Sequence, residues 1–153
     1  MNGANKQKYL SGSLLYFLSV LKTIIDYKPL EIKIGIDNKI FEKKIWLIAF
    51  ANSSLFGGGM KIAPYASPSD GLIDLIIVGP ISKFDFLKTF PKVYKGEHVN
   101  HPSISFFRGK KINIGHKGKN NLSVFADGEN FGLLPINIEL SEFKLKQLVP
   151  KNI

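Results

Sequence analysis

The sequence has 153 residues, 44% of them hydrophobic, which is enough for one domain with its own core. It contains no cysteine, which excludes a disulfide framework, a thiolate metal site and a thiol nucleophile. Lysine and arginine number 21 against 12 acidic residues, giving a net charge of +9, and Arg108 is the only arginine. This charge is typical of a lysine-rich solvated surface, or of a protein attracted to lipid headgroups, ATP or nucleic acid, and both remain open.

The first predicted element is a helix over residues 13–26. Apolar residues recur there with i, i+3, i+4, i+7 spacing, and Pro29 follows where a helix would end. Isoleucines alternate with other residues over 32–36, which predicts a half-buried strand. After a turn at Asp37-Asn38, residues 41–51 predict a longer and more buried strand.

Residues 73–78 form a continuous apolar run, which predicts an interior strand. The segment from Ser82 to Asp85 has a capping-box pattern and predicts a helix over 83–94, broken or kinked at Pro91. Three apolar side chains of that helix are available for burial, namely Phe84, Leu87 and Phe90. Residues 95–102 are expected to form a loop.

The rest of the chain predicts short strands separated by turn residues, over 104–108, 110–115, 121–126, 134–140 and 143–149. Many short strands with turns between them are typical of a sandwich or a barrel. The predicted fold class is therefore mainly β (α+β), an antiparallel β-sandwich with two peripheral helices. We expect residues 1–153 to form this single domain.

Three consecutive glycines, Gly57, Gly58 and Gly59, lie between the strand that ends at Ala51 and the one that begins at Ile73. Glycine is used where the backbone takes positive φ or passes close to another group. The segment is therefore either a tight corner with a bulge or the border of a site. By itself it is not a nucleotide loop, because neither the Walker pattern nor GxGxxG occurs there.

The segment Asp127-Gly128-Glu129 also has two interpretations. Asp-Gly is a strong signal for a hairpin turn. Alternatively, the glycine lets two carboxylates turn toward one point, where they can accept a hydroxyl proton and hold Mg²⁺ against phosphate oxygens.

Two histidines, His98 and His101, lie close together near Glu97 and raise the question of a zinc site. We do not expect zinc, because Gly96 and Pro102 disfavour a helix there and no third strong ligand is nearby.

Several of these segments together resemble one family. The resemblance rests on Asn52, Gly57-Gly-Gly-Met60, Ala63-Pro64, Ala66, Asp70-Gly-Leu-Ile-Asp74, Gly96-Glu-His98, Asp127-Gly-Glu129 and Leu148-Val-Pro150. Each piece is weak alone, but the ordered set covers nearly the whole chain. The chain resembles the second domain of the soluble bacterial diacylglycerol kinase family, which also includes sphingosine kinases and related lipid kinases. This implies the same β-sandwich.

The resemblance implies an ATP-dependent kinase that transfers the γ-phosphate to a lipid hydroxyl, with diacylglycerol or a similar lipid as acceptor and Mg²⁺ as cofactor. It implies that Asp127 is the general base and that Glu129 supports it or contacts the nucleotide through metal and water. Asn52 and the three glycines from Gly57 to Gly59 would border the cleft that faces the nucleotide.

Similar lipid kinases also hold a structural or regulatory cation with an aspartate side chain and main-chain carbonyls. Carried over by position, this implies a cation at Asp70 with the carbonyl oxygens of Ser67 and Leu72. It would be distinct from the metal on ATP, and the alternative is a bare turn.

The family binds ATP largely through a preceding α/β domain with a Gly-Gly-Asp-Gly-Thr motif, which occurs nowhere in this sequence. We therefore expect the chain to lack that domain, to need it as a partner, and to be inactive alone. We expect a cytoplasmic protein that can lie at an anionic membrane surface. Whether it forms a homodimer is left open.

The competing hypothesis is a non-enzymatic, basic β-sandwich module that binds a membrane surface or RNA. A nucleic acid is the less expected partner, because the sequence shows no ladder of stacking aromatics. Strand aromatics such as Phe106, Phe107 and Phe125 are more simply core residues.

Overall fold

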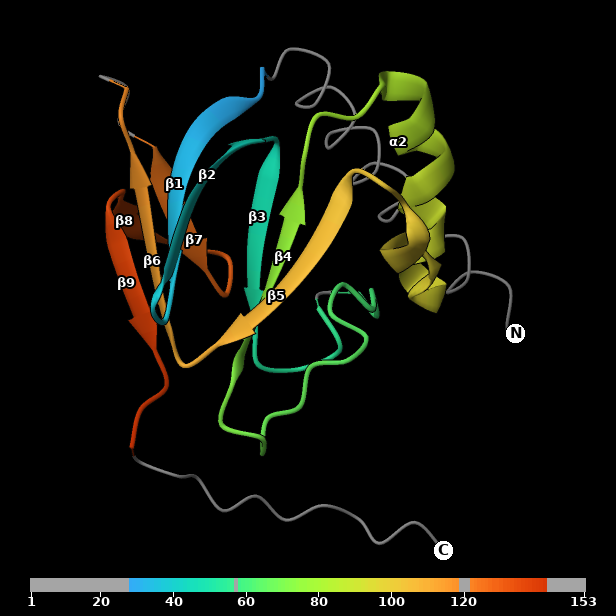
Figure 1. The fold of residues 1–153 in the computed structure, drawn as a ribbon. Helices are drawn as coiled ribbons and strands as arrows, with labels where there is room; N and C mark the ends of the chain where they lie inside the picture. The colour runs from blue at the N-terminus through green and yellow to red at the C-terminus, as the bar shows by residue number, and fades with distance from the viewer. Residues whose placement is uncertain (1–27, 57, 119–121, 143–153) are drawn as a thin grey trace, which may run out of the picture.

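The computed structural model describes residues 28–56, 58–118 and 122–142, and they form mainly antiparallel β-structure (Figure 1). The predicted fold class is confirmed. The helix predicted over 13–26 and the strand predicted over 143–149 lie outside the described residues. Within the described ranges, the helical segments are all too short or too polar to span a bilayer.

The first layer is a four-stranded antiparallel sheet in the order β2-β1-β6-β9. Its strands are β1 (Leu30–Ile36), β2 (Lys39–Ile45), β6 (Lys111–His116) and β9 (Ile136–Glu139). The register places Ile34 opposite both Phe41 and Ile114, so the alternating isoleucines of β1 and β6 share one face.

The second layer is a three-stranded antiparallel sheet in the order β3-β4-β5. Its strands are β3 (Leu47–Ala51), β4 (Ile73–Val78) and β5 (Ile104–Gly109). The central strand β4 is buried on both faces from Ile73 to Ile77, which confirms the predicted interior strand.

The core lies between the two layers. It combines isoleucines of the four-stranded sheet with Ile73, Leu75 and Ile77 of β4. Each fully buried aliphatic side chain contributes about 1.5–3 kcal/mol relative to an exposed one, so this interface holds the sandwich together. At its border, the rings of Phe41 on β2 and Phe107 on β5 lie 5.1 Å apart.

The strand predicted over 41–51 is wrong in one respect, because it is two strands in two different sheets. The strand β2 ends at Ile45, β3 begins at Leu47, and the bend between them is Trp46. The backbone N–H of Trp46 donates to the carbonyl of Val78 at 2.8 Å. The chain therefore crosses from one layer of the sandwich to the other within a single apolar run.

The predicted helix over 83–94 is shorter than expected. The α-helix α2 spans Lys83–Thr89 and continues as a 3-10 helix, η1 (Phe90–Lys95), with Pro91 at its start. The predicted cap is confirmed, because the Ser82 hydroxyl accepts a hydrogen bond from the Asp85 N–H at 3.1 Å. Two of the apolar side chains available for burial, Phe84 and Leu87, are instead exposed.

The predicted loop over 95–102 contains a second 3-10 helix, η2 (Glu97–Asn100), which follows the left-handed Gly96. In Figure 1, α2 and the segments after it lie beside the three-stranded sheet, on the side away from the four-stranded sheet. These helical segments therefore form a third, partial layer.

A separate two-stranded ribbon completes the described part of the chain. It consists of β7 (Ser123–Ala126) and β8 (Glu129–Leu133), and it pairs with neither of the two larger sheets. The strand predicted over 121–126 corresponds to β7, whereas β8 was not expected as a strand. The strand predicted over 134–140 corresponds to the shorter β9.

Candidate functional site

The two carboxylates of Asp127 and Glu129 lie at the tip of the β7–β8 hairpin. Asp127 and Gly128 have φ values of 49° and 89°. Positive φ at both central positions is the geometry of the type I′ turn, which Asp-Gly favours. Ala126 pairs with Glu129 across this turn, and both acidic residues are exposed. The hairpin therefore presents two exposed carboxylates, separated in the chain by Gly128, at its tip.

The aromatic residues of this hairpin are also exposed. Phe125 is 67% exposed and Phe131 is 77% exposed, so the expectation that Phe125 belongs to the core is wrong. Strand alternation predicts which residues share a face but not whether another layer covers that face. By contrast, Phe106 and Phe107 on β5 are half-buried.

The glycine segment forms a tight corner in its described part. Phe56 and Met60 exchange two backbone hydrogen bonds, of 2.8 and 3.0 Å. Between them, Gly58 and Gly59 have φ values of 71° and 85°, and a Cβ added at either would meet nothing within 4 Å. Glycine is thus needed here for its backbone conformation rather than for a close approach. Gly57 lies outside the described residues.

The segment that follows is anchored on the 3-10 helices. The N–H of Lys61 donates to the carbonyl of Val93 at 3.0 Å. His98 is only 3% exposed, and its Nε2 lies 3.0 Å from the carbonyl of Ile62. Because only an N–H can bond to a carbonyl, Nε2 carries the proton, and the buried Nδ1 has no partner within the described residues. Burial lowers the pKa of His98, and the Ile62 carbonyl partly offsets this.

His101, the second histidine of this region, is engaged by the backbone as well. Its Nδ1 accepts the N–H of Ser103 at 3.1 Å. Among residues 28–56, 58–118 and 122–142, no group of three His, Cys, Asp or Glu side chains is placed to hold a metal ion.

The Asp70 turn is held by its own side chains. The Asp70 Oδ1 accepts the N–H of Leu72 at 3.0 Å, and Gly71 between them has a φ of 73°. The hydroxyls of Ser67 and Ser69 lie 3.2 Å apart. Asp70, Ser67 and Leu72 therefore lie in one turn, as their positions in the sequence predict.

The guanidinium of Arg108 contacts this turn from the neighbouring strand. Its Nη2 donates to the Tyr65 carbonyl at 2.7 Å and to the Asp70 Oδ2 at 3.0 Å, and its Nε donates to the Asp74 Oδ1 at 2.8 Å. Asp74 is only 4% exposed. The hydrogen bond to Asp74, followed by the charges of Asp74 and Asp70, raises the pKa of Arg108.

Arg108, Asp74 and Ala51 form one row across β5, β4 and β3. Asn52 follows Ala51 directly, so it lies at the same end of the three-stranded sheet as the Asp70 turn. No hydrogen bond or ion pair joins this end of the sheet to the Asp127 hairpin within the described part of the chain. The sequence-predicted residues thus fall into two separate groups.

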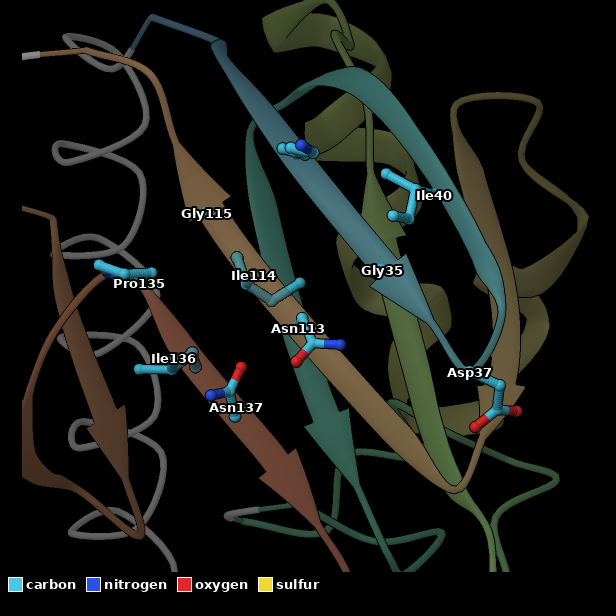
Figure 2. A pocket seen from close by; sticks show the side chains of 10 residues that line it. Gly35, Asp37, Ile40, Asn113, Ile114, Gly115, Pro135, Ile136 and Asn137 are labelled. Carbon is cyan, nitrogen blue, oxygen red and sulfur yellow. The ribbon is translucent and has the colours of Figure 1, made fainter.

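A shallow hollow of about 300 Å³ lies on the outer face of the four-stranded sheet, away from the core (Figure 2). Gly35 on β1 and Gly115 on β6 contribute no side chain to its floor. Its other lining residues are Lys33, Asp37, Ile40, Asn113, Ile114, Pro135, Ile136 and Asn137. It includes none of the residues that the sequence predicts for a catalytic, nucleotide-binding or metal site.

Two features of this region were not anticipated. The pairing of Arg108 with Asp70 was missed, although a single arginine among 21 basic residues is a signal that its guanidinium has a special partner. The hollow was missed as well, and its signal is the isolated glycine inside a predicted strand, at Gly35 and at Gly115.

Comparison with known proteins places these features in a family. A protein-family profile described as "YegS C-terminal NAD kinase beta sandwich-like domain" matches residues 1–152. The chain is 30% identical over 150 residues to a protein from Mycobacterium tuberculosis named diacylglycerol kinase, covering 97% of this chain and 48% of that protein. It is 30% identical over 131 residues to a Bacillus subtilis protein of the same name, covering 86% of this chain and 43% of that one.

A crystal structure of a diacylglycerol kinase from Bacillus anthracis superimposes with a TM-score of 0.65 at 25% identity, over 90% of this chain and 46% of that chain. The chain thus spans about half the length of the relatives it matches. The same fold and a match over residues 1–152 show that the chain belongs to the YegS C-terminal NAD kinase beta-sandwich-like domain family, which is found in diacylglycerol kinases.

Proposed function

We propose that this chain is the acceptor-binding and catalytic-carboxylate half of an ATP-dependent lipid kinase. In this proposal the γ-phosphate of ATP passes to the hydroxyl of diacylglycerol or a similar lipid. A nucleotide-binding domain of this family supplies the phosphate-binding loop. Support comes from the relatives, which are named diacylglycerol kinases and of which this chain covers about half.

The observation that carries the proposal is the type I′ turn at Asp127-Gly128. It holds Asp127 and Glu129 at the exposed tip of a hairpin, where they are free to meet a substrate from another domain. Neither of these two carboxylates is in an ion pair with a described residue. An unpaired carboxylate at an exposed tip is available to accept a proton.

The chemistry assigns one role to each carboxylate. A lipid hydroxyl is too weak an acid to lose its proton unaided at neutral pH, so it needs a base within hydrogen-bond reach as the phosphate arrives. In the proposal Asp127 is that base. Glu129 supports it or contacts the nucleotide through Mg²⁺ and water, since metal ions neutralise the charge that develops on transferring phosphate oxygens.

The nucleotide side of the site is assigned to Asn52 and to the three glycines, Gly57, Gly58 and Gly59. Asn52 directly follows Ala51, the last residue of β3, and is exposed. Gly58 and Gly59 form an exposed corner shortly after it. In the proposal these residues border the cleft that faces the nucleotide domain.

The test is phosphate transfer from labelled ATP to diacylglycerol in mixed micelles, with this chain joined to a nucleotide-binding domain of the family. Asp127→Asn keeps the shape and removes the base, so turnover should fall by ~10²–10⁴-fold. Glu129→Gln should cost less if its contact is mediated by water. Glu139→Gln is the matched control, because it removes an exposed carboxylate of β9 that pairs only with Lys111 among the described residues.

A folded Asp127→Asn protein with near wild-type turnover would place the base elsewhere and reduce this turn to a structural hairpin. A loss as large in the Glu139→Gln control would show that the assay responds to surface charge rather than to the base.

A further inference from the structure

We infer that the Arg108 guanidinium is the permanent cation of the Asp70 turn, so that this turn does not bind a metal ion. The inference does not depend on the proposed kinase activity. It stands against the predicted metal at Asp70, Ser67 and Leu72, because a guanidinium already pairs with the Asp70 carboxylate.

The carboxylate on which a metal at this turn would depend already has a cationic partner. Hard cations prefer carboxylate and main-chain carbonyl oxygens. Arg108 takes one of each, because its Nη2 donates to the Asp70 Oδ2 at 3.0 Å and to the Tyr65 carbonyl at 2.7 Å. The other carboxylate oxygen of Asp70 accepts the Leu72 N–H at 3.0 Å, so both Asp70 oxygens have donors.

Asp74 explains why the guanidinium stays in this position. It is buried on β4, directly opposite Arg108 in the register of β4 and β5. A buried carboxylate is costly without a partner, and Arg108 supplies its Nε at 2.8 Å and its Nη2 at 3.3 Å. Moving the guanidinium away would leave the Asp74 carboxylate unpaired inside the protein.

The geometry of arginine suits it to this dual contact. Its planar fork of five donors can satisfy two carboxylates and a carbonyl at once, whereas the ammonium of lysine is a point charge. Arg108 is the only arginine in a chain with 21 basic residues. One guanidinium thereby connects β5, β4 and the turn between Tyr65 and Asp70. A structural cation would connect the same segments in the same way.

The test measures cation binding directly on the full chain, with terbium as a hard-cation probe whose luminescence is excited through Tyr65 of this turn. Thermal unfolding with and without millimolar Ca²⁺ or Mg²⁺ gives a second readout, since a ligand that binds only the folded state raises its stability. The wild type should show neither a terbium signal nor a midpoint shift that depends on Asp70. Signal lost in Asp70→Asn would overturn the inference, whereas signal retained in Asp70→Asn would place the ion elsewhere and support it.

Arg108→Gln provides the converse test. Removing the guanidinium frees the oxygens of Asp70, Asp74 and Tyr65, so this variant should gain terbium luminescence and a midpoint rise of several degrees in Ca²⁺. Both gains should disappear in the double variant Arg108→Gln/Asp70→Asn. Lys111→Gln is the matched control, because it removes one positive charge from the neighbouring strand β6 and should gain nothing.

A folded Arg108→Gln protein that gains no cation binding would show that Arg108 does not stand in for a cation. If Arg108→Gln does not fold in the absence of cations, recovery of its β-sheet circular dichroism by Ca²⁺ replaces the midpoint as the readout. Absence of recovery would then count against the inference.

Discussion

Asp37 and Lys111 are joined by two hydrogen bonds that run in opposite directions. The N–H of Asp37 donates to the Lys111 carbonyl at 2.9 Å, and the Asp37 Oδ1 accepts the Lys111 N–H at 2.9 Å. The same Oδ1 accepts the N–H of Lys110 at 2.9 Å. One carboxylate thus fastens the β1–β2 turn to the point where the chain passes from β5 to β6, and so from one layer of the sandwich to the other.

This relationship predicts a specific order of stability among variants of Asp37. Asp37→Asn keeps the acceptor oxygen and tolerates the positive φ of 49°, so it should cost least. Asp37→Gly still adopts the positive φ but loses the acceptor oxygen. Asp37→Ala loses both, and its free energy of unfolding should fall by roughly 2–3 kcal/mol. Urea unfolding followed by circular dichroism measures the free energy of unfolding. An alanine variant as stable as the asparagine variant would contradict this account.

Gly109 lies beside the Asp37 hydrogen bonds, and its tight surroundings predict the effect of adding a side chain there. A Cβ at Gly109 would lie 2.5 Å from Ile36 Cγ2 and 3.1 Å from Asp37 Oδ2, and Ile36 is a buried core residue. Gly109→Ala should therefore destabilise the fold by about 1–3 kcal/mol. Gly115→Ala is the control, because nothing lies within 4 Å of its added Cβ, and alanine in a strand is favoured over glycine by about 0.5–1 kcal/mol. Thermal unfolding of the two variants measures the difference. Equal unfolding midpoints would show that the fold relieves the close approach at Gly109 without a loss of stability.

His98 predicts a pH dependence. Because burial lowers its pKa in the folded state, the unfolded state binds the proton more readily. Its contribution to stability is therefore intact above the unfolded pKa of about 6.5 and is lost as the pH falls from there toward the folded pKa. The free energy of unfolding of the wild type should fall over this window, and that of His98→Gln should fall less. His116→Gln is the matched control, because it removes a half-buried histidine that is bonded to the Glu31 carbonyl.

Asp127→Asn should leave the stability of the fold nearly unchanged. Asparagine accepts the φ of 49° at this turn position almost as well as aspartate, whereas alanine does not. The expected change in the free energy of unfolding is within about 0.5 kcal/mol for asparagine at this exposed site, with a larger loss for Asp127→Ala. Thermal melts of the two variants measure this directly. A strongly destabilised asparagine variant would mean that a loss of transfer activity cannot be assigned to the missing base.

Local patterns were sufficient for much of the fold. The apolar run of β4, the alternating isoleucines of β1 and the cap at Ser82 each depend on a few neighbouring residues, and each is confirmed. The Asp-Gly signal predicted a turn at Asp127, and the structure has one. The strand that pairs with β7 across this turn, β8, was not predicted from the sequence. It has few apolar residues, and its pairing depends on the turn rather than on burial.

The change of sheet at Trp46 was not visible for a similar reason. A strand that switches layers keeps the same apolar residues on both sides of the bend, so periodicity does not distinguish it from one long strand. The candidate site shows the same limit. The sequence placed Asp70 in a turn with a cation as its possible partner, but its counterion in the structure is Arg108, 38 residues later. Such a contact follows from strand register, which the local sequence does not specify.

Trp46, at the bend between β2 and β3, is a natural fluorescence probe of the sandwich. It is the only tryptophan in the sequence, and its indole N–H is buried without a partner among the described residues. Trp46 lies between β2 of the four-stranded sheet and β3 of the three-stranded sheet. Its intrinsic fluorescence therefore reports on the packing of one sheet against the other. A state that retains both sheets while they separate would change the emission of Trp46 but leave the far-ultraviolet circular dichroism almost unaltered.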